Sequence, residues 1–468
     1  QISVLSFSEA MLAPGHGSAA SLRAAPADAP GVARQKELLG RLYDPKASRA
    51  AVLATVDALH RRQWLETPGH YAAAVYALGQ HSLWQAAVAV VADMAGGVGL
   101  GVKALGAAIS ACGRGKQWRP ALHLLRFARS SGTRLNVVVL NAAMSACSGS
   151  GQWQRVLLLL AAMEEYTAMP DRTSCNTAIS ACARGRRWEL ALSLFEGLAG
   201  HGLEADVVTC NAVLSALAKG RQWGRALALL TTAEEAGPAP DVVSYNSALD
   251  SLPEGGAGTA LALELLAELR ARHVEPSVIT YNTALRVCSG SPDVQLRLLS
   301  EMQRRGPRPN VRTYNSAIRA CVGGGLWERA LALAAEMRRV GLAVDVVTCN
   351  TAISACAAAG RWPWALLLLV EMGRLRLACD AISCGSAISA CAGGGQWQLA
   401  LSLLWEAWYG GVALDVVACN AAISACEKSH AWEQTLLILK SMVQLRLRPD
   451  VVTFNAMISA SEKGQQWE

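Results

Sequence analysis

Tryptophan recurs along this chain at a fixed interval. Trp118, Trp153, Trp188 and Trp223 are each 35 residues apart, and the same interval returns in the series that runs from Trp327 to Trp467. A fixed period of this length is typical of solenoids, in which a repeat buries its apolar faces only by stacking on its neighbours. The 468 residues therefore predict one long array rather than a few independent domains.

Each repeat contains two segments with helical spacing. Ile353 and Cys356 lie on one stripe of the first segment, and Trp362, Leu366 and Leu369 follow the 3.6-residue period in the second. Ala and Leu are abundant, which favours helix. We predict an all-α fold, a right-handed α-solenoid superhelix of helix-turn-helix repeats.

Aligned Asn and Asp residues set the boundaries. We expect an Ala-rich leader at 1–47 that is disordered or transit-like, a capping helix and a degenerate repeat at 48–101, ten repeats at 102–450 and a truncated repeat at 451–468. Repeats 242–277 and 278–310 depart from the period and lack the marker Trp, so we expect a local irregularity there. Because the sequence begins at Gln1 and ends inside a repeat, we expect it to be part of a longer protein.

Composition excludes several classes of protein. The apolar runs at 156–163 and 365–372 are too short to cross a bilayer, so we expect no membrane span. The net charge of +7 is mild and is compatible with a polyanionic partner. Of the fourteen Cys, all except Cys379 recur at repeat positions 4 and 11, counted from the residue after the boundary Asp. They form no CxxC motif and have no companion His, so core packing is favoured over disulfides or a metal site, and we expect a reducing compartment.

Three recurring residues have both a structural and a functional interpretation. The Trp at position 17 is either an apolar plug between repeats or a platform for base stacking, and its phase with the Leu and Met stripe favours the plug. Asn at position 5 is a mediocre helix former and either forms a ladder between repeats or contacts a ligand. The boundary Asp directly precedes a helix, where it can serve as an N-cap.

These residues carry a resemblance. Starts such as DVVTCN, a second helix that opens with Trp, a Met near position 27 and PD at the end of the repeat resemble the pentatricopeptide repeat family over roughly 68–468. The tetratricopeptide repeat is the nearest rival, but its period is about 34 residues, and it does not call for Asn at position 5 with Asp at the last position.

The resemblance implies an RNA-binding surface read one base per repeat. The base-reading residues implied are the position-5 and last-position pairs Asn141/Asp171, Asn176/Asp206, Asn211/Asp241, Asn246/Ser277, Asn282/Asn310, Asn315/Asp345, Asn350/Asp380 and Asn420/Asp450, together with Asn455. The residues implied to wedge between bases lie at position 2: Val138, Val208, Val243, Ile279, Val347, Ile382, Val417 and Val452, with Thr173 in the same place. The implied phosphate contacts are Arg114, Arg184, Lys219, Lys428 and Lys463, for which a solvated surface is the alternative.

In the family, Asn with Asp favours U, Asn with Ser favours C, and Asn with Asn favours either pyrimidine. The repeat order then predicts 5′-UUUCYUUnU, where Y is a pyrimidine. The letter n is the repeat in which Gly385 replaces Asn, and Gly106 likewise leaves the first repeat unreadable. Arg312 departs from the wedge pattern.

We therefore expect a sequence-selective single-stranded RNA-binding protein with a U-rich preference. It would serve organellar RNA processing, stability or translation in a chloroplast or mitochondrion, without membrane contact. No catalytic constellation, Walker loop or zinc-deaminase motif is present in the sequence, so we expect no enzyme, no cofactor and no metal. Two alternatives stay open: a helical-repeat scaffold for protein partners, and an RNA-processing enzyme whose catalytic domain lies beyond residue 468.

Overall fold

A computed structural model describes residues 29–463 except 43–47, 98, 100, 164, 166–167, 199, 201, 237 and 446. The described residues form α-helices and no strands, as the periodicity predicts. The chain divides into two compact bodies. The N-terminal body comprises 1–150 with 161–169, and the C-terminal body comprises 151–160 with 170–468.

The N-terminal body stacks helical hairpins. Its helices are α2 (Ala29–Leu42), α3 (Arg49–Arg61), α4 (Pro68–Gln80), α5 (Trp84–Gly97), α6 (Val102–Arg114), α7 (Trp118–Ser130) and α8 (Val137–Gly149). The first helices α4, α6 and α8 pack on one another in order, while α5 packs against both α4 and α6. Helix α9 (Trp153–Ala162) contains the division between the bodies.

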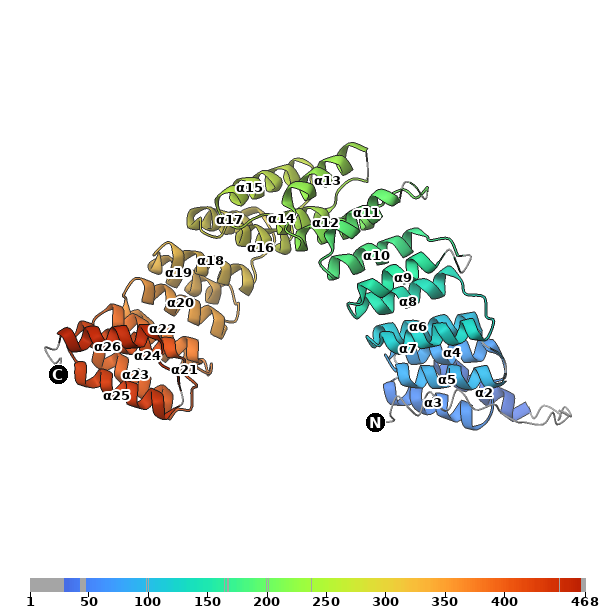
Figure 1. Cartoon of the computed structure of the whole chain (residues 1–468), viewed down its shortest axis with the longest axis horizontal. Helices are drawn as coiled ribbons and strands as arrows, with labels where there is room; N and C mark the ends of the chain where they lie inside the picture. The colour runs from blue at the N-terminus through green and yellow to red at the C-terminus, as the bar shows by residue number, and fades with distance from the viewer. Residues whose placement is uncertain are drawn as a thin grey trace. The chain divides into compact units, whose positions relative to one another are not determined.

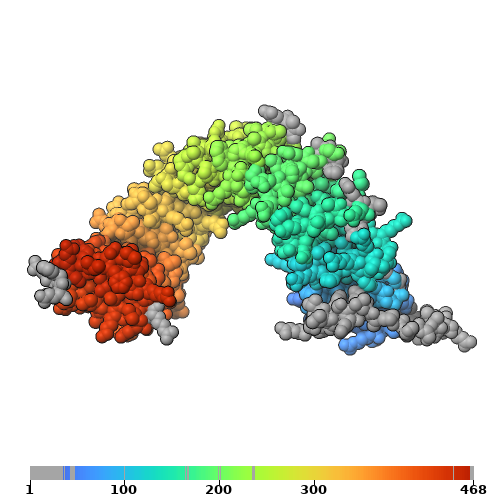
Figure 2. Space-filling view, in the orientation of Figure 1, coloured from blue at the N-terminus to red at the C-terminus, as the bar shows by residue number. Residues whose placement is uncertain are grey.

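The C-terminal body repeats this arrangement eight times over. Its helices are α10 (Arg172–Arg184), α11 (Trp188–Gly197), α12 (Val207–Lys219), α13 (Trp223–Ala236), α14 (Val242–Ser251), α15 (Gly256–Ala271), α16 (Val278–Val287), α17 (Pro292–Arg305), α18 (Val311–Gly323), α19 (Trp327–Arg339), α20 (Val346–Ala358), α21 (Trp362–Arg374), α22 (Ala381–Gly393), α23 (Trp397–Tyr409), α24 (Val416–Lys428), α25 (Trp432–Gln444) and α26 (Val451–Lys463). Consecutive even-numbered helices pack on one another and form one layer (Figure 1). Each odd-numbered helix from α11 on packs against its own first helix and the first helix of the next repeat, so that successive repeats lie directly against one another (Figure 2).

Small side chains allow the first helices to approach closely. On α20, Ala352, Ile353, Ala355 and Cys356 are all buried. The cysteines are unpaired thiols, and all except Cys379 and Cys384 are buried, which confirms the core-packing interpretation. Burial raises the pKa of the Cys356 thiol to about 11, so these thiols stay protonated at neutral pH and behave as small apolar groups.

The marker tryptophans join one repeat to the next. The indole of Trp362, the first residue of α21, lies over Gly394, the residue that caps the C-terminus of α22. Trp153 and Trp188 lie in the same way over Gly185 and Gly220. The predicted plug is thus found between repeats, but these indoles are half-buried rather than sealed in the core. The guanidinium of Arg187 covers the outer face of the Trp153 ring at 5.2 Å.

The expected irregularity is found in the two atypical repeats. Their first helices, α14 and α16, have 10 residues, whereas α12 and α18 have 13. Helix α14 ends at Ser251, one residue before the Leu252 that precedes Pro253, because a residue before proline is forced out of the helical conformation.

The ends of the chain are described in part. Within the segment expected to be a leader, Ala29–Leu42 form helix α2, which packs against α3 and α4. An interpretation of the whole of 1–47 as a disordered leader is therefore wrong for α2, and 1–28 and 43–47 lie outside the described residues. Within 48–101, the range expected to hold a capping helix and a degenerate repeat, the first helix is α3. The last marker, Trp467, also lies outside the described residues.

Candidate nucleic-acid interface

The boundary acids cap the first helices. Oδ1 of Asp345 accepts the backbone N–H of Thr348 at 2.8 Å, and Oδ1 of Asp380 accepts that of Ser383 at 2.8 Å. Each carboxylate satisfies a donor that the first turn of a helix leaves without a partner, and its charge complements the helix dipole. The N-cap interpretation of the last position is confirmed for these residues.

The same carboxylates hold the position-5 amides of the preceding first helix. Nδ2 of Asn350 donates to Oδ1 and Oδ2 of Asp380 at 3.0 and 3.1 Å. The Nδ2–Oδ1 distance is also 3.1 Å from Asn211 to Asp241 and from Asn420 to Asp450, and 3.4 Å from Asn315 to Asp345. The Asn ladder between repeats therefore exists, and it is made of the same couples that the family resemblance implies for base reading.

The electrostatics keep these acids ionised. Burial opposes ionisation of Asp345, but hydrogen bonds from Thr348 and Asn315 outweigh it and hold the pKa of Asp345 below its ordinary value. Burial is likewise outweighed at Asp380, where hydrogen bonds from Ser383 and Asn350 lower the pKa. The pKa is lowered in the same way at Asp206, Asp241 and Asp450. An ionised carboxylate accepts hydrogen bonds only, so it holds the Nδ2 side of the neighbouring amide toward itself.

Most of the couples are partly accessible from outside. Of the position-5 residues in the C-terminal body, Asn350 is the most buried at 8% exposure, while Asn211, Asn315 and Asn420 are half-buried. The position-2 residues beside them are far more open: the eight aliphatic side chains predicted as wedges are between 50% and 71% exposed. β-Branched apolar side chains gain nothing from water, so this row is suited to contact with flat apolar groups.

Several predicted couples differ from this geometry. Asn246 and Ser277 form no hydrogen bond to each other in the described structure, and Oδ1 of Asn246 is buried without a partner. The hydroxyl of Thr313 lies within hydrogen-bond distance of Oδ1 of both Asn282 and Asn310 and can donate its proton to one of them at a time. The hydroxyl of Thr209 lies in the same way between Oδ1 of Asn176 and Oδ1 of Asp206, and, against the effect of burial, a hydrogen bond from Asn176 helps to lower the pKa of Asp206. Asn141 belongs to the N-terminal body and Asp171 to the C-terminal body, while Asn455 is exposed on α26.

The basic residues at position 13 divide into two groups. Nε of Arg114 donates to the carbonyl of Gly79 at 2.7 Å, and Nζ of Lys428 donates to that of Ala392 at 3.3 Å. Both carbonyls lie at the end of the preceding first helix, where a cation is favoured by the helix dipole. Lys463 forms an ion pair with Glu427 at 2.8 Å. These three side chains thus have structural partners, which the sequence did not predict.

Arg184 and Lys219 form the second group. Both are exposed and form no hydrogen bond or ion pair with another described residue. They lie about 12 Å along the first helix from position 5, at a rise of roughly 1.5 Å per residue. Of the predicted phosphate contacts, these two are the ones whose side chains are not already held by a described residue.

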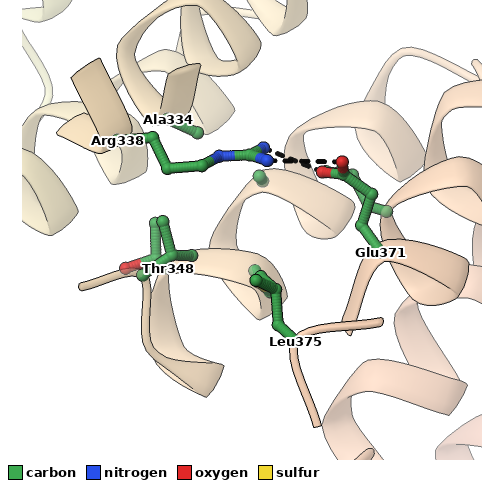
Figure 3. Close-up of a pocket in the computed structure, with 9 residues that line it drawn as sticks. Ala334, Arg338, Thr348, Glu371 and Leu375 are labelled. Carbon is green, nitrogen blue, oxygen red and sulfur yellow. Dashed lines mark hydrogen bonds and ion pairs between the residues drawn. The ribbon is translucent and has the colours of Figure 1, made fainter. Parts of the chain in front are cut away.

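A small pocket between α19, α20 and α21 offers no alternative site. It is lined by apolar residues such as Ala334 and Leu375, and Arg338 and Glu371 meet across it at 2.8 Å (Figure 3). Because its two charged groups bind each other, the pocket presents no free charge to a ligand. Thr348 forms part of its wall.

The part of the chain that the structure describes offers neither a metal site nor a membrane-spanning helix. No cluster of three or more His, Cys, Asp or Glu side chains is placed to bind a metal ion. No helix there combines the length and apolar character that crossing a bilayer requires.

The sequence did not lead us to predict one set of residues that contacts the Asn and Asp couples. At five Asn and Asp couples of the C-terminal body, the Thr or Ser at position 3 of the following repeat places its hydroxyl against both residues. Ser383, for example, lies 2.5 Å from Oδ1 of Asn350 and 2.9 Å from Oδ1 of Asp380. The signal was present in the alignment of the repeats, because the hydroxyl recurs at one position. It was hidden because Thr and Ser in the first turn of a helix are common for capping alone.

Family models match this chain at several places. A model described as "Pentatricopeptide repeat domain" matches 193–252, 258–291 and 402–463, one described as "PPR repeat family" matches 309–357, and one described as "PPR repeat" matches 173–203 and 347–377. Together they cover more than half of the chain. A search of curated protein sequences found no match.

A solved structure shares the fold. The crystal structure of the pentatricopeptide repeat protein PPR10 from maize matches with a TM-score of 0.61 and 23% identity over 92% of this chain and 62% of that one. This chain thus spans less than two thirds of the maize protein. The crystal structure of PPR10 in complex with an 18-nt psaJ RNA element matches with a TM-score of 0.44 and 23% identity, over 94% of this chain and 65% of that one. The matched models, the helical hairpins and the recurring Asn and Asp couples lead to one conclusion: this chain belongs to the pentatricopeptide repeat family.

Proposed function

We propose that this chain binds single-stranded RNA, with one base at each repeat and a preference for pyrimidines. The observation that carries the proposal is the row of amide–carboxylate couples, which recur at the repeat spacing and lie, at most repeats, beside an exposed aliphatic side chain. Membership of the family favours RNA as the ligand. An amide carries both a donor and an acceptor, which suits the pairing edge of a pyrimidine.

The bound strand runs with its 5′ end toward the first repeats and matches 5′-UUUCYUUnU. Exposed residues such as Val347 and Ile382 insert between neighbouring bases, where their branched side chains cover the faces of the rings. Arg184 and Lys219 contact phosphates, so that binding weakens as salt increases. The chain acts by occupying RNA in a chloroplast or mitochondrion, where it protects, remodels or presents a transcript without catalysing a reaction itself.

A second function has one observation in its favour. Trp364, Leu367 and Val370 are exposed on one face of α21, and exposed apolar patches are common at protein interfaces. A helical-repeat scaffold for protein partners is therefore the competing proposal, and RNA selectivity separates the two.

The test is an anisotropy titration of labelled RNA. The predicted sequence should bind more tightly than oligo-C, and oligo-A should bind most weakly. The pair Asn350→Ala with Asp380→Ala should weaken binding of the predicted sequence about tenfold, which corresponds to roughly 1.4 kcal/mol. Equal and weak binding to all three RNAs would favour the scaffold.

Asp415→Ala is the matched control. Asp415 caps α24 through the N–H of Ala418 at 2.9 Å, as Asp380 caps α22, but its repeat has Gly385 in place of the Asn. The control thus removes a helix cap and no amide couple, and its RNA affinity should stay close to that of the unmodified chain. If the double variant melts at a much lower temperature and keeps its RNA affinity, the couples serve the fold alone.

A further inference from the structure

Each amide–carboxylate couple has a third member that lies out of reach of any ligand. Thr348, Ser383 and Thr453 are 0% exposed. Their hydroxyls lie 2.7, 2.5 and 2.6 Å from Oδ1 of the position-5 Asn in the preceding repeat. The same contact measures 2.6 Å from Thr209 to Asn176 and from Ser244 to Asn211. A buried hydroxyl can affect RNA only through the amide and the carboxylate that it contacts.

Helix capping does not require this hydroxyl. At the start of α24 the residue in this place is Ala418, and its N–H is still accepted by Oδ1 of Asp415 at 2.9 Å. At the start of α8 it is Val139, whose N–H is accepted by Oδ1 of Asn136 at 3.0 Å. Both helices begin at the same repeat position as the others. Elsewhere the hydroxyl also accepts the N–H of the boundary residue in a capping box, as Ser383 does from Asp380 at 3.3 Å, but this local bond does not account for its contact with the Asn of the preceding repeat.

Within this one chain the hydroxyl accompanies the amide. Every full repeat with Asn at position 5 is followed by a repeat with Thr or Ser at position 3. The two repeats with Gly at position 5, at Gly106 and Gly385, are followed by Val139 and Ala418. In the atypical repeat, the hydroxyl of Thr280 bonds Ser277 instead, and Oδ1 of Asn246 is left without a partner.

The hydroxyl and the carboxylate together define how the amide is turned. At Asn350, Nδ2 faces Asp380 and Oδ1 faces Ser383. A reversed amide would place Oδ1 against an ionised carboxylate, where two acceptors repel each other. One hydrogen of Nδ2 and one lone pair of Oδ1 remain for an outside partner, and their positions follow from the two inward contacts.

We propose that the position-3 hydroxyl is a positioning residue for base selectivity. It acts with the boundary acid to present the amide of the preceding repeat in one orientation. Each base-binding slot, by which we mean the place of one base at one repeat, then needs three residues rather than two. The inference rests on the proposed function, because it assigns how the base-reading Asn is oriented. The slots at Gly106 and Gly385 lack both the amide and the hydroxyl and accept any base.

The first experiment removes one hydroxyl. Thr348→Val keeps the shape of the side chain, and Thr348→Ser keeps the hydroxyl. RNAs that carry U or C at the sixth position of the predicted sequence, opposite repeat 311–345, give the base preference of that slot as a ratio of dissociation constants. Thr348→Val should reduce the ratio about fivefold, the factor that corresponds to one ordinary hydrogen bond, whereas Thr348→Ser should stay within about twofold of the unmodified chain.

Asn315→Ala in the same assay separates the two proposals. If Asn315→Ala leaves RNA binding and base preference unchanged, the proposed function fails and the inference falls with it. If Asn315→Ala abolishes the preference while Thr348→Val retains it in full, the RNA-binding function stands and the positioning role is overturned.

The second experiment adds a base-reading amide and its hydroxyl to a repeat that lacks both. Because it looks for a gain of base preference, a loss of stability cannot mimic the expected result. A side chain at Gly385 would meet the Cβ of Ala418 at 3.5 Å, an ordinary contact, and Asp415 is already in place. Gly385→Asn combined with Ala418→Thr should create a preference for U at the eighth nucleotide about fivefold stronger than Gly385→Asn alone. An equal preference in the single and double variants would refute the need for the hydroxyl.

Discussion

The contact between Trp362 and Gly394 makes a quantitative prediction about how repeats are joined. A Cβ on Gly394 would lie 2.2 Å from Cδ1 of the indole, whereas carbon atoms in contact prefer about 3.5–4.0 Å. Gly394 has φ −89° and ψ 3°, a conformation that alanine adopts without strain. The cost of Gly394→Ala is therefore steric, and the indole must move by more than an ångström.

We expect Gly394→Ala to lower the free energy of unfolding by about 1–3 kcal/mol, the range for overpacking, reduced by about 0.4–1 kcal/mol because alanine restricts the unfolded chain. Gly373→Ala is the matched control. Gly373 lies inside α21 with no atom within 4 Å of an added Cβ, so this variant should be more stable by about 0.5–1 kcal/mol. Urea denaturation followed by circular dichroism measures both.

A double-mutant cycle identifies the cause. In a Trp362→Ala background the added methyl group at position 394 meets no ring, so Gly394→Ala should then cost nothing or stabilise slightly. A penalty of the same size with and without the indole would refute the reasoning, as would a Gly394→Ala chain as stable as the unmodified one.

Two more predictions concern charge. Hydrogen bonds from Thr348 and Asn315 outweigh burial and lower the pKa of Asp345 in the folded chain. The ionised carboxylate therefore stabilises the folded chain at neutral pH. This stabilisation is lost as the pH falls through the ordinary Asp range to the lowered pKa. Asp345→Asn should therefore reduce stability at neutral pH and flatten the acid limb of a stability-against-pH curve; an unchanged curve would contradict this. Arg184→Ala should make the negative slope of log affinity against log salt less steep by about 0.7, as expected for the loss of one phosphate contact on a single strand, and should leave the melting temperature unchanged. Arg114→Ala should instead lower the melting temperature, because the guanidinium of Arg114 donates a hydrogen bond to the carbonyl of Gly79.

Much of the fold could be predicted because its causes are local and repeated. Apolar spacing identified both helices of each repeat, and Asp345 and Asp380 marked helix starts because a carboxylate before the first turn satisfies its N–H groups. The buried thiols followed from their position on one stripe. Helix α2 was not anticipated, since Ala-rich composition describes a helix and a leader equally well.

The contacts between repeats were less predictable. They join residues about one repeat apart, as in Arg114 to Gly79 and Trp362 to Gly394, and periodicity identifies each partner without showing that the two meet. The same holds for Thr348, whose hydroxyl has an obvious local use as part of a cap. Its contact with Asn315 depends on how closely α18 and α20 pack, which the spacing of residues within either helix does not report.

The structural and functional interpretations of the Asn and Asp residues are not exclusive, because one set of atoms supports both. The inward hydrogen bonds that tie α20 to α22 through Asn350, Ser383 and Asp380 also hold the amide still before any ligand arrives. A side chain that is already ordered loses little conformational entropy on binding, and such preorganisation increases affinity without adding contacts. A ladder that served the fold alone would have no need for the exposed aliphatic residues beside it, which gain nothing from water. Their exposure at nearly every repeat is the feature that the RNA-binding proposal explains and a purely structural ladder does not.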